Sequence, residues 1–279
     1  MSRLEELFPA ELDARLAQTP ALLIPLGTIE WHGHHLPLGL DVLKAQALAA
    51  EAARRCGGVL APPLWLAAGG VSFPHTLRLP GALIEPLLAE ALAQFAGDGF
   101  RVLCVVNGHY GLENTLAVKR AAAEAMRRTE ATVLAVADYE LLIAEGARGD
   151  HAGEWETALL WAVRPELVRL GDAGEQPGVS GAPPDAASEE QGRQGLALAG
   201  VRLGEAIERS LHEVREEYRA ALDAGIRALE SLWDLRERVG RDHAPPVQTG
   251  TWLEHCVALH EGRYEDAKEA ALRKRREIV

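Results

Sequence analysis

The sequence has few cysteines, few aromatic residues and no long hydrophobic run, and each shortage excludes a class of protein. Its three cysteines stand in no C-x-x-C spacing, so they give no disulfide framework and fit a reducing compartment. Aromatic residues make up only 5% of the chain while Ala and Leu abound, which favours helices and parallel strands over a β-sandwich. No apolar run is long enough to span a bilayer, and the first residues lack the apolar stretch of a signal peptide. We therefore expect a soluble, cytoplasmic protein with no membrane partner.

Basic residues and nucleotide-binding motifs are also in short supply. Lys and Arg number 29 against 41 Asp and Glu, and the net charge of -12 repels phosphate backbones, so nucleic acid is not an expected partner. The basic run from Arg273 to Arg276 reads as the solvated end of a helix, where cations suit the helix dipole. No G-x-G-x-x-G sequence follows a predicted strand and no Walker A sequence occurs, which argues against a nucleotide-binding oxidoreductase.

Short apolar runs alternate with helical patterns over most of the chain. With 48% hydrophobic residues in 279, the chain can bury the core of one large α/β domain. The predicted strands are 21–26, 59–61, 101–106 and 132–137, and the predicted helices are 41–55, 82–95, 113–128 and 157–163. This alternation predicts a mostly parallel central sheet with helices on both faces.

The C-terminal part of the sequence has a different character. Residues 174–191 are rich in Gly, Pro, Ser and Ala and predict a long surface loop. One long amphipathic helix is predicted by apolar residues that step by three or four: Ile207, Leu211, Val214, Tyr218, Leu222, Ile226, Leu229 and Leu232. A shorter helical stretch runs from about Trp252 to the end. We therefore expect an α/β domain over 1–205 and a helical extension over 206–279, packed on the domain or on a neighbouring subunit.

Polar residues that carry chemistry follow the predicted strands. Glu30 and His32 follow the first strand, and His109 follows the third. Asp41 comes nine residues after His32, behind a turn-prone segment, and Glu156 lies in the stretch after the fourth strand. In open parallel sheets, ligands bind beyond the carboxyl ends of the strands, so these side chains are expected to converge.

The residue types in this group are those of a metal site. Carboxylates can bridge two cations, and a mixed nitrogen and oxygen set suits Zn, Mn, Fe or Co rather than a closed thiolate site. Each residue also has a plainer reading: His109 as a hydrogen-bonded structural residue, Asp41 as a helix cap, and Glu156 as part of a solvated helix. The convergence of three clusters at one sheet edge favours the metal site.

Three segments, GTIEWHGHHLPLGLD, VVNGHYG and HAGEWETALLWAVRPELV, together resemble the motifs of the creatininase (creatinine amidohydrolase) family. The resemblance covers roughly residues 20–205 in the family's order. It implies an α/β fold with a binuclear metal site, commonly in homohexamers, so we expect a homo-oligomer that binds two divalent ions, Zn and/or Mn, with Fe as a further option. By position it implies these ligands: Glu30, His32, Asp41 as the bridging carboxylate, and His109.

The third motif receives its roles from the same resemblance. Glu156 matches the Glu of H-x-G-x-x-E-T, which implies a residue of the metal site that also takes part in catalysis. His151 matches the histidine that transfers a proton, and it would protonate the leaving nitrogen while a metal-activated water attacks.

Departures from the family pattern bear on the substrate. Gly111 stands where creatininase proper has Glu, and Glu113 could replace that Glu only if the loop is rearranged. Tyr139 and Ala147 lie near the positions of the tryptophans that enclose creatinine, which argues against creatinine itself. His75 stands where the family usually has Gly, either as a polar group of the pocket or as packing at its rim.

These features predict a metal-dependent amidohydrolase that cleaves a non-peptide or cyclic amide C–N bond of a small-molecule amide. The alternatives are a deformylase or peptide-maturation hydrolase of the same family, and a non-catalytic metal-binding member. The intact ligand set argues against the last.

Overall fold

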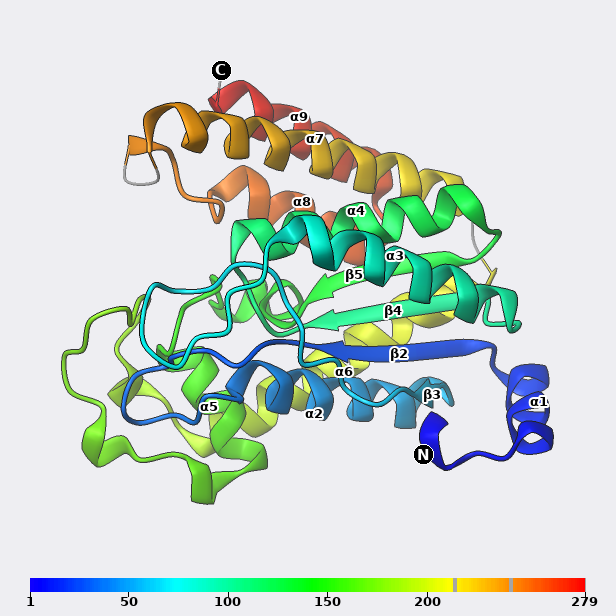
Figure 1. Cartoon of the computed structure of the whole chain (residues 1–279), viewed down its shortest axis with the longest axis horizontal. Helices are drawn as coiled ribbons and strands as arrows, with labels where there is room; N and C mark the ends of the chain where they lie inside the picture. The colour runs from blue at the N-terminus through cyan, green and yellow to red at the C-terminus, as the bar shows by residue number, and fades with distance from the viewer. Residues whose placement is uncertain (213–214, 241–242, 279) are drawn as a thin grey trace.

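The computed structural model describes residues 1–212, 215–240 and 243–278, and a parallel sheet forms its centre (Figure 1). The strand order is β1-β3-β2-β4-β5, and every pairing between these strands is parallel. The strands are β1 (Ser2–Arg3), β2 (Ala21–Leu26), β3 (Val59–Leu60), β4 (Val102–Asn107) and β5 (Thr132–Ala137). The sequence prediction of a mostly parallel sheet is confirmed, and only the two-residue strand β1 was missed.

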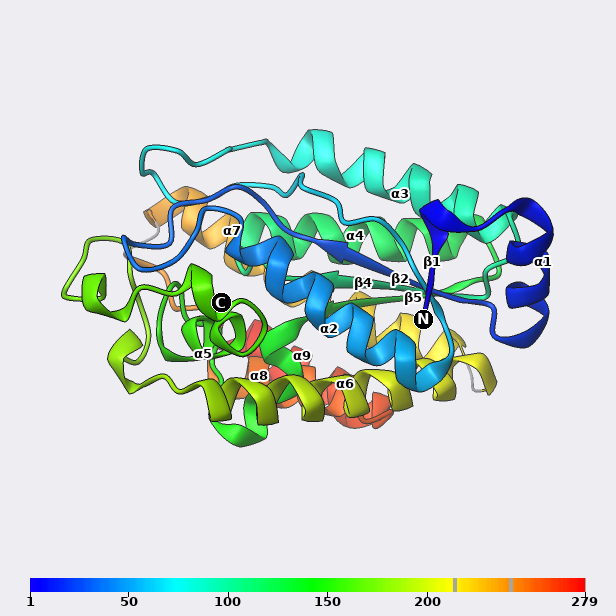
Figure 2. The ribbon, with the colours of Figure 1, turned by 90° about the horizontal axis from the view of Figure 1, so that it is seen from below.

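Helices cover both faces of the sheet, as the continuous apolar strands require. Every residue of β2, β4 and β5 is buried, which is typical of strands covered on both sides. Helices α2 (Leu40–Cys56) and α6 (Glu189–His212) pack together on one face, and α3 (Gly81–Gly97) and α4 (Leu112–Arg128) on the other (Figure 2). Helix α1 (Pro9–Gln18) precedes β2, and α5 (Glu154–Val163) packs on α6 at the end of the molecule where the strands finish.

The C-terminal helices differ from the sequence-based expectation. The predicted helix across 207–232 is in fact α6 followed by α7 (Arg215–Val239), and Val214 of the predicted stripe lies outside the described residues. Helix α6 packs on α2, whereas α7 packs on α4 and α9 (Figure 1). The single-helix prediction was wrong because the apolar spacing continues across the point where the chain changes sides. Helix α6 also begins inside the predicted 174–191 loop.

The stretch predicted as helical from Trp252 onward consists of α8 (Gly250–His260) and α9 (Tyr264–Ile278). Helices α7, α8 and α9 lie together beside α4 and the β5 edge (Figure 1). The proposed division between residues 205 and 206 falls within α6, and the separation into two units stays a prediction. None of the described helices is long and apolar enough to cross a membrane.

Helix α7 protects the outer edge of β5. The backbone N–H of Ala135 donates to the Tyr218 hydroxyl at 3.2 Å, and the Lys119 ammonium donates to the Ala135 carbonyl at 3.1 Å. Both polar groups of Ala135 therefore have partners on the side away from β4. Satisfying the edge in this way prevents it from pairing with another strand.

Candidate metal centre

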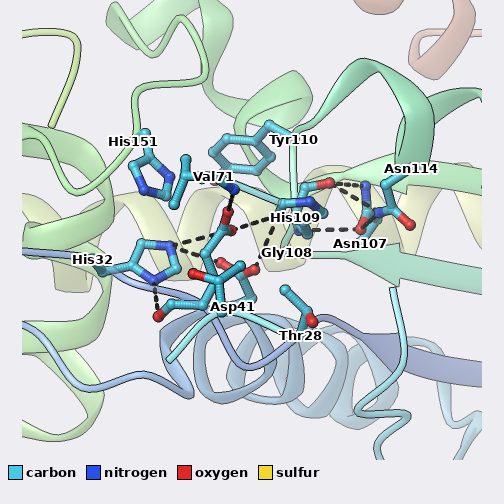
Figure 3. A network of polar contacts seen from close by, with 12 residues as sticks. Thr28, His32, Asp41, Val71, Asn107, Gly108, His109, Tyr110, Asn114 and His151 are labelled. Carbon is cyan, nitrogen blue, oxygen red and sulfur yellow. Dashed lines mark hydrogen bonds and ion pairs between the residues drawn. The ribbon is translucent and has the colours of Figure 1, made fainter. Parts of the chain in front are cut away.

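The predicted site residues meet at the carboxyl ends of β2 and β4. They lie at the floor of a cavity of about 710 Å³ whose lining includes Glu30, Asp41, His109, His151 and Glu156. His32 is not part of this lining and is fully buried. Figure 3 shows the side chains of His32, Asp41 and His109 pointing toward one another, with His151 close to His32.

A first group of potential ligands consists of Glu30, Asp41 and His109. The Nδ1 atom of His109 lies 2.8 Å from Glu30 Oε2 and 3.3 Å from Asp41 Oδ2. The other Glu30 oxygen, Oε1, accepts the backbone N–H of Val71 at 2.6 Å. Glu30 is therefore oriented by the chain so that one oxygen remains directed at the group.

A second group consists of His32, Asp41 and Glu156, and it shares Asp41 with the first. The Nε2 atom of His32 lies 3.1 Å from Asp41 Oδ1 and 3.7 Å from Glu156 Oε2. The opposite nitrogen, Nδ1, is 3.1 Å from the Glu30 carbonyl oxygen. A carbonyl only accepts, so Nδ1 carries a hydrogen and Nε2 is the nitrogen that would bind a metal once it has lost its own proton, the usual arrangement of a metal-binding histidine.

The chemistry of these atoms fits divalent cations. Within these two groups, five buried side-chain atoms have no hydrogen-bond partner among the described residues: Glu30 Oε2, His32 Nε2, both carboxylate oxygens of Asp41, and His109 Nε2. Buried polar atoms without partners are costly and uncommon in proteins. Four of the five face the two groups that share Asp41, and cations bound there would satisfy them. Asp41, with one oxygen toward each group, is placed to bridge.

The ionisation of the cluster shows how strongly it attracts positive charge. Burial lowers the pKa of His32, but the carboxylates of Asp41, Glu156 and Glu30 outweigh it and raise the pKa to about 9. Burial and the carboxylates of Glu30 and Asp41 act on His109 in the same way, and its pKa rises to about 10. Against the effect of burial, the two imidazoles hold the pKa of Asp41 well below its usual range. Protons and metal ions compete for such sites.

Two asparagines fix the loop that carries His109. Asn107 donates to the His109 carbonyl at 2.7 Å and accepts the His109 N–H at 3.1 Å. Asn114 of α4 donates to Asn107 Oδ1 at 2.9 Å and to the His109 carbonyl at 3.1 Å. The N-G-H motif thus holds the imidazole in place by closing a tight turn at the end of β4 (Figure 3).

The position of Asp41 depends on close backbone approach. A Cβ atom on Gly108 would lie 2.1 Å from the Asp41 carbonyl oxygen, and one on Gly27 would lie 2.6 Å from Asp41 Cβ. Asp41 does not cap α2: the cap position is Gly39, and among the described residues no backbone amide donates to the Asp41 carboxylate.

His151 lies against the second group. Its Nε2 atom is 2.9 Å from the Trp31 carbonyl oxygen, so Nε2 donates and Nδ1 carries the lone pair. Its ring centroid is 4.5 Å from that of His32, and Glu30, His32 and His151 form a further group of potential ligands. Burial, followed by the nearby His32, lowers the pKa of His151, which favours the neutral imidazole.

Glu156 is held by contacts that the sequence did not reveal. Its Oε2 atom accepts the backbone N–H of Ala152 at 2.7 Å, and its Oε1 atom lies 2.9 Å from the ammonium of Lys44. Lys44 is fully buried on α2. In the sequence, the only sign of this burial is that the lysine stands on the apolar face of its helix. Ala152 has a φ of 55°, an uncommon conformation for a residue other than glycine.

Other residues considered from the sequence lie away from the two groups. Glu113 accepts the Gly81 N–H at 2.7 Å at the start of α3. It therefore does not take the place of the Glu that creatininase proper has at the position of Gly111. Tyr139 and Ala147 are buried, and the Tyr139 hydroxyl accepts the indole N–H of Trp252 at 3.3 Å. His75 is exposed with a φ of 65°, which explains why glycine suits this position.

The cavity has a second wall that comes from the C-terminal part of the chain. Trp233 and Arg236 of α7 and Gln248 of the following loop line the same cavity as Glu30 and Asp41. Access to the candidate metal centre is therefore shaped by residues far from it in sequence.

Buried carboxylates and imidazoles at the carboxyl ends of parallel strands are the residue types and the position that suit a metal-binding active site in an α/β fold. The family model for creatininase, described as creatinine amidohydrolase, matches residues 5–229. The chain belongs to the creatininase family, which confirms the resemblance found in the sequence and the expected class of hydrolase acting on C–N bonds.

Individual relatives agree with this assignment. The creatinine amidohydrolase of Pseudomonas putida is 31% identical over 191 residues, or 59% of this chain and 73% of that protein. The mycofactocin precursor peptide peptidase of Mycolicibacterium smegmatis is 32% identical over 160 residues, or 54% of this chain and 61% of that protein. Solved structures of a manganese creatininase and of a Zn–Zn mutant creatininase each align with a TM-score of 0.67 over 76% of this chain and 100% of theirs, at 26% and 25% identity.

Proposed function

We propose that the protein is a metal-dependent amidohydrolase that cleaves a non-peptide or cyclic amide C–N bond. The observation that carries the proposal is the pair of buried ligand groups that share Asp41 and leave their lone pairs without hydrogen bonds. Manganese and zinc forms of creatininase support Zn and/or Mn as the ions. When bound, two such ions activate a water and polarise the scissile carbonyl.

The chain's own residues have distinct roles in this proposal. Glu30, Asp41 and His109 hold one ion, and His32, Asp41 and Glu156 hold the other. The lowered pKa of His151 favours its neutral form, and its Nδ1 lone pair accepts a proton from the attacking water and then donates it to the leaving nitrogen. The Trp31 carbonyl fixes the orientation of this imidazole by accepting from Nε2.

The first test is the metal content per chain of protein purified without chelators. We expect a stoichiometric transition metal in the parent and its loss in Asp41→Asn, because both groups use this carboxylate. Glu140→Gln is the matched control, since it removes a buried carboxylate that pairs with His260 rather than with the cluster. A parent protein that neither contains Zn or Mn nor takes them up would refute the proposal.

A peptide is the second candidate substrate, and the size of the cavity favours it. A volume of about 710 Å³ lies within the range of pockets for drug-sized ligands and exceeds the needs of a single small ring. The peptidase relative acts, by its name, on a precursor peptide. A panel of creatinine, small lactams, formamides and short peptides, assayed with the metal-loaded protein, separates the candidates by kcat/KM.

We also infer that the chain forms a homo-oligomer, and a hexamer is one candidate for its size. Leu64, Trp65 and Leu66 are consecutive and exposed by 36%, 39% and 45%, and Trp65 lies against Gly39 beside the exposed Leu38. Contiguous exposed apolar side chains are typical of association surfaces. Light scattering after size exclusion measures the assembly, and a monomer at micromolar concentration would contradict it. A cytoplasmic location stays a prediction.

A further inference from the structure

Lys44 is a buried lysine of α2 whose ammonium contacts Glu156 of the candidate metal centre. It lies three residues after Asp41 on the same helix and is 1% exposed. Its ammonium lies 2.7 Å from the Gly108 carbonyl oxygen, 2.9 Å from Asp138 Oδ2 and 2.9 Å from Glu156 Oε1. A buried cation with this many partners has a single well-defined position.

Two further residues hold Lys44 in that position. The Tyr110 hydroxyl lies 2.5 Å from the Lys44 ammonium and donates to Asp138 Oδ1. Both oxygens of Asp138 are therefore engaged, one by Lys44 and one by Tyr110. Asp138 balances the charge of the lysine, so the ion pair with Glu156 is not needed merely to neutralise it.

The contact with Glu156 decides how that carboxylate faces the second ligand group. Oε1 is occupied by Lys44, and only Oε2 is directed toward His32. The Ala152 N–H donates to Oε2 as well, which fixes the rotation of the carboxylate from the other side. Glu156 is thus presented through one oxygen.

The first ligand group has no such support from Lys44. Glu30 is oriented by the Val71 amide, and His109 by the two asparagines. Lys44 contacts the loop that carries His109 at the Gly108 carbonyl and the Tyr110 hydroxyl, and no contact is recorded between its ammonium and the side chains of Glu30 or His109. An effect of Lys44 on metal binding should therefore be unequal between the two groups.

We propose that Lys44 is a positioning residue that fixes Glu156 as a one-oxygen ligand and thereby governs the affinity of the His32–Asp41–Glu156 group for its cation. The inference rests on the proposed metal centre. It predicts that loss of the lysine weakens one of two metal positions and spares the other.

The experiment is a Mn²⁺ titration of the metal-free full-length protein, followed by equilibrium dialysis and electron paramagnetic resonance. The parent is expected to bind two ions per chain with a spin-coupled spectrum. Lys44→Met is expected to keep the first affinity and to weaken the second by about 10- to 100-fold, as is typical when a supporting contact of a ligand is removed. At one ion per chain it should give the uncoupled spectrum of isolated Mn²⁺.

Two further variants separate positioning from folding. Lys44→Gln combined with Asp138→Asn removes one charge of each sign, so the buried net charge is kept while Glu156 loses its ion pair, and the same selective loss is expected. Lys119→Met is the matched control, because Lys119 is also a buried lysine paired with a carboxylate, Glu140, remote from the cluster. It should bind both ions as the parent does.

The possible results of the Mn²⁺ titration distinguish a failure of the Lys44 proposal from a failure of the metal centre itself. Two ions bound with parental affinities by the Lys44 variants, or an equal loss of both ions in the folded double variant, would overturn the role of Lys44 and leave the metal centre standing. A parent that binds no Mn²⁺ or Zn²⁺ would overturn the metal centre and this inference together.

Discussion

At the scale of single residues, the candidate site depends on glycines, which leave room for close backbone contact, as much as on its charged side chains. Gly108 and Gly27 directly follow β4 and β2, and both lie against the backbone or Cβ of Asp41. This contact places the Asp41 carboxylate between the two candidate ligand groups. A methyl group on Gly108 has no room, because the neighbouring atom is a backbone carbonyl oxygen that cannot rotate away.

Gly108→Ala is therefore expected to displace the start of α2, to lower the free energy of unfolding by about 1–3 kcal/mol, and to abolish tight metal binding. Chemical unfolding and metal content measure the two effects. Gly97→Ala is the control, since a Cβ there meets no atom within 4 Å. Parental metal binding in Gly108→Ala would show that Asp41 is not positioned by this contact.

The sequence was informative about residues that follow strands and uninformative about residues that support them. The order of Glu30, His32 and His109 after apolar runs was sufficient to bring them together, because parallel strands end at one edge of the sheet. Lys44 was missed, since a lone lysine in a helix is exposed in most proteins, and its burial depends on Asp138 and Tyr110 from distant segments.

At the scale of secondary structure elements, strands β2 to β5 were predicted within one residue, whereas β1 and the division of the C-terminal helices were not. Fully buried strands such as β2 and β5 have an uninterrupted apolar run that needs no tertiary information. The change from α6 to α7 is decided by which face of the sheet each helix covers, and the 3.6-residue periodicity does not encode it.

Tyr218→Phe tests how α7 protects the sheet edge. The variant keeps the ring but leaves the Ala135 N–H without its partner, so we expect a loss of about 1–3 kcal/mol in the free energy of unfolding. Hydrogen exchange should rise at Ala135 more than at residues of β4. Unchanged stability together with unchanged exchange would mean that the hydroxyl is not needed there.

His255 links the three C-terminal helices and predicts a dependence of stability on pH. It lies on α8, and its Nδ1 donates to the Ala267 carbonyl of α9 at 2.9 Å. Its Nε2 packs against Gly225 of α7, so closely that a Cβ added to this glycine would lie 2.4 Å from the nitrogen. Burial lowers the pKa of His255 to about 4. Because the unfolded histidine titrates near 6.5, protonation favours unfolding, and the stability present above pH 6.5 is lost as the pH falls toward 4.

The measurement compares urea unfolding of the parent and of His255→Asn at pH 7.5 and pH 4.5. We expect the parent to lose about 2 kcal/mol more than the variant on acidification, because only the parent must keep this imidazole neutral. Equal losses in both proteins would assign the acid sensitivity to other groups.

At the scale of the whole molecule, the C-terminal helices and the sheet domain share one of their apolar cores. This cluster draws on α4, α7, α8 and α9, and its buried members are Leu112, Leu116, Leu229, Leu232, Val247, Trp252, Cys256 and Ile278. Each large apolar side chain of such a cluster contributes about 1.5–3 kcal/mol when buried. Their sum is comparable with the total stability of a typical domain.

Removal of residues 240–279 is therefore expected to expose the α4 and α7 side of this cluster. The truncated protein should bind a hydrophobic dye, melt at least several degrees lower, and lose solubility. A truncated protein that melts like the parent would instead show that α8 and α9 are not needed for the stability of the rest of the chain.

The wall that Trp233, Arg236 and Gln248 add to the cavity has a consequence for the evolution of this lineage. These positions lie beyond the part of the chain matched by the family model, whereas the candidate ligands lie within it. Mutations that accumulate in the C-terminal residues can alter the shape and polarity of the cavity without changing the candidate metal ligands. Divergence among close descendants of this gene should therefore be greatest in that wall, and new substrate preferences should arise there first.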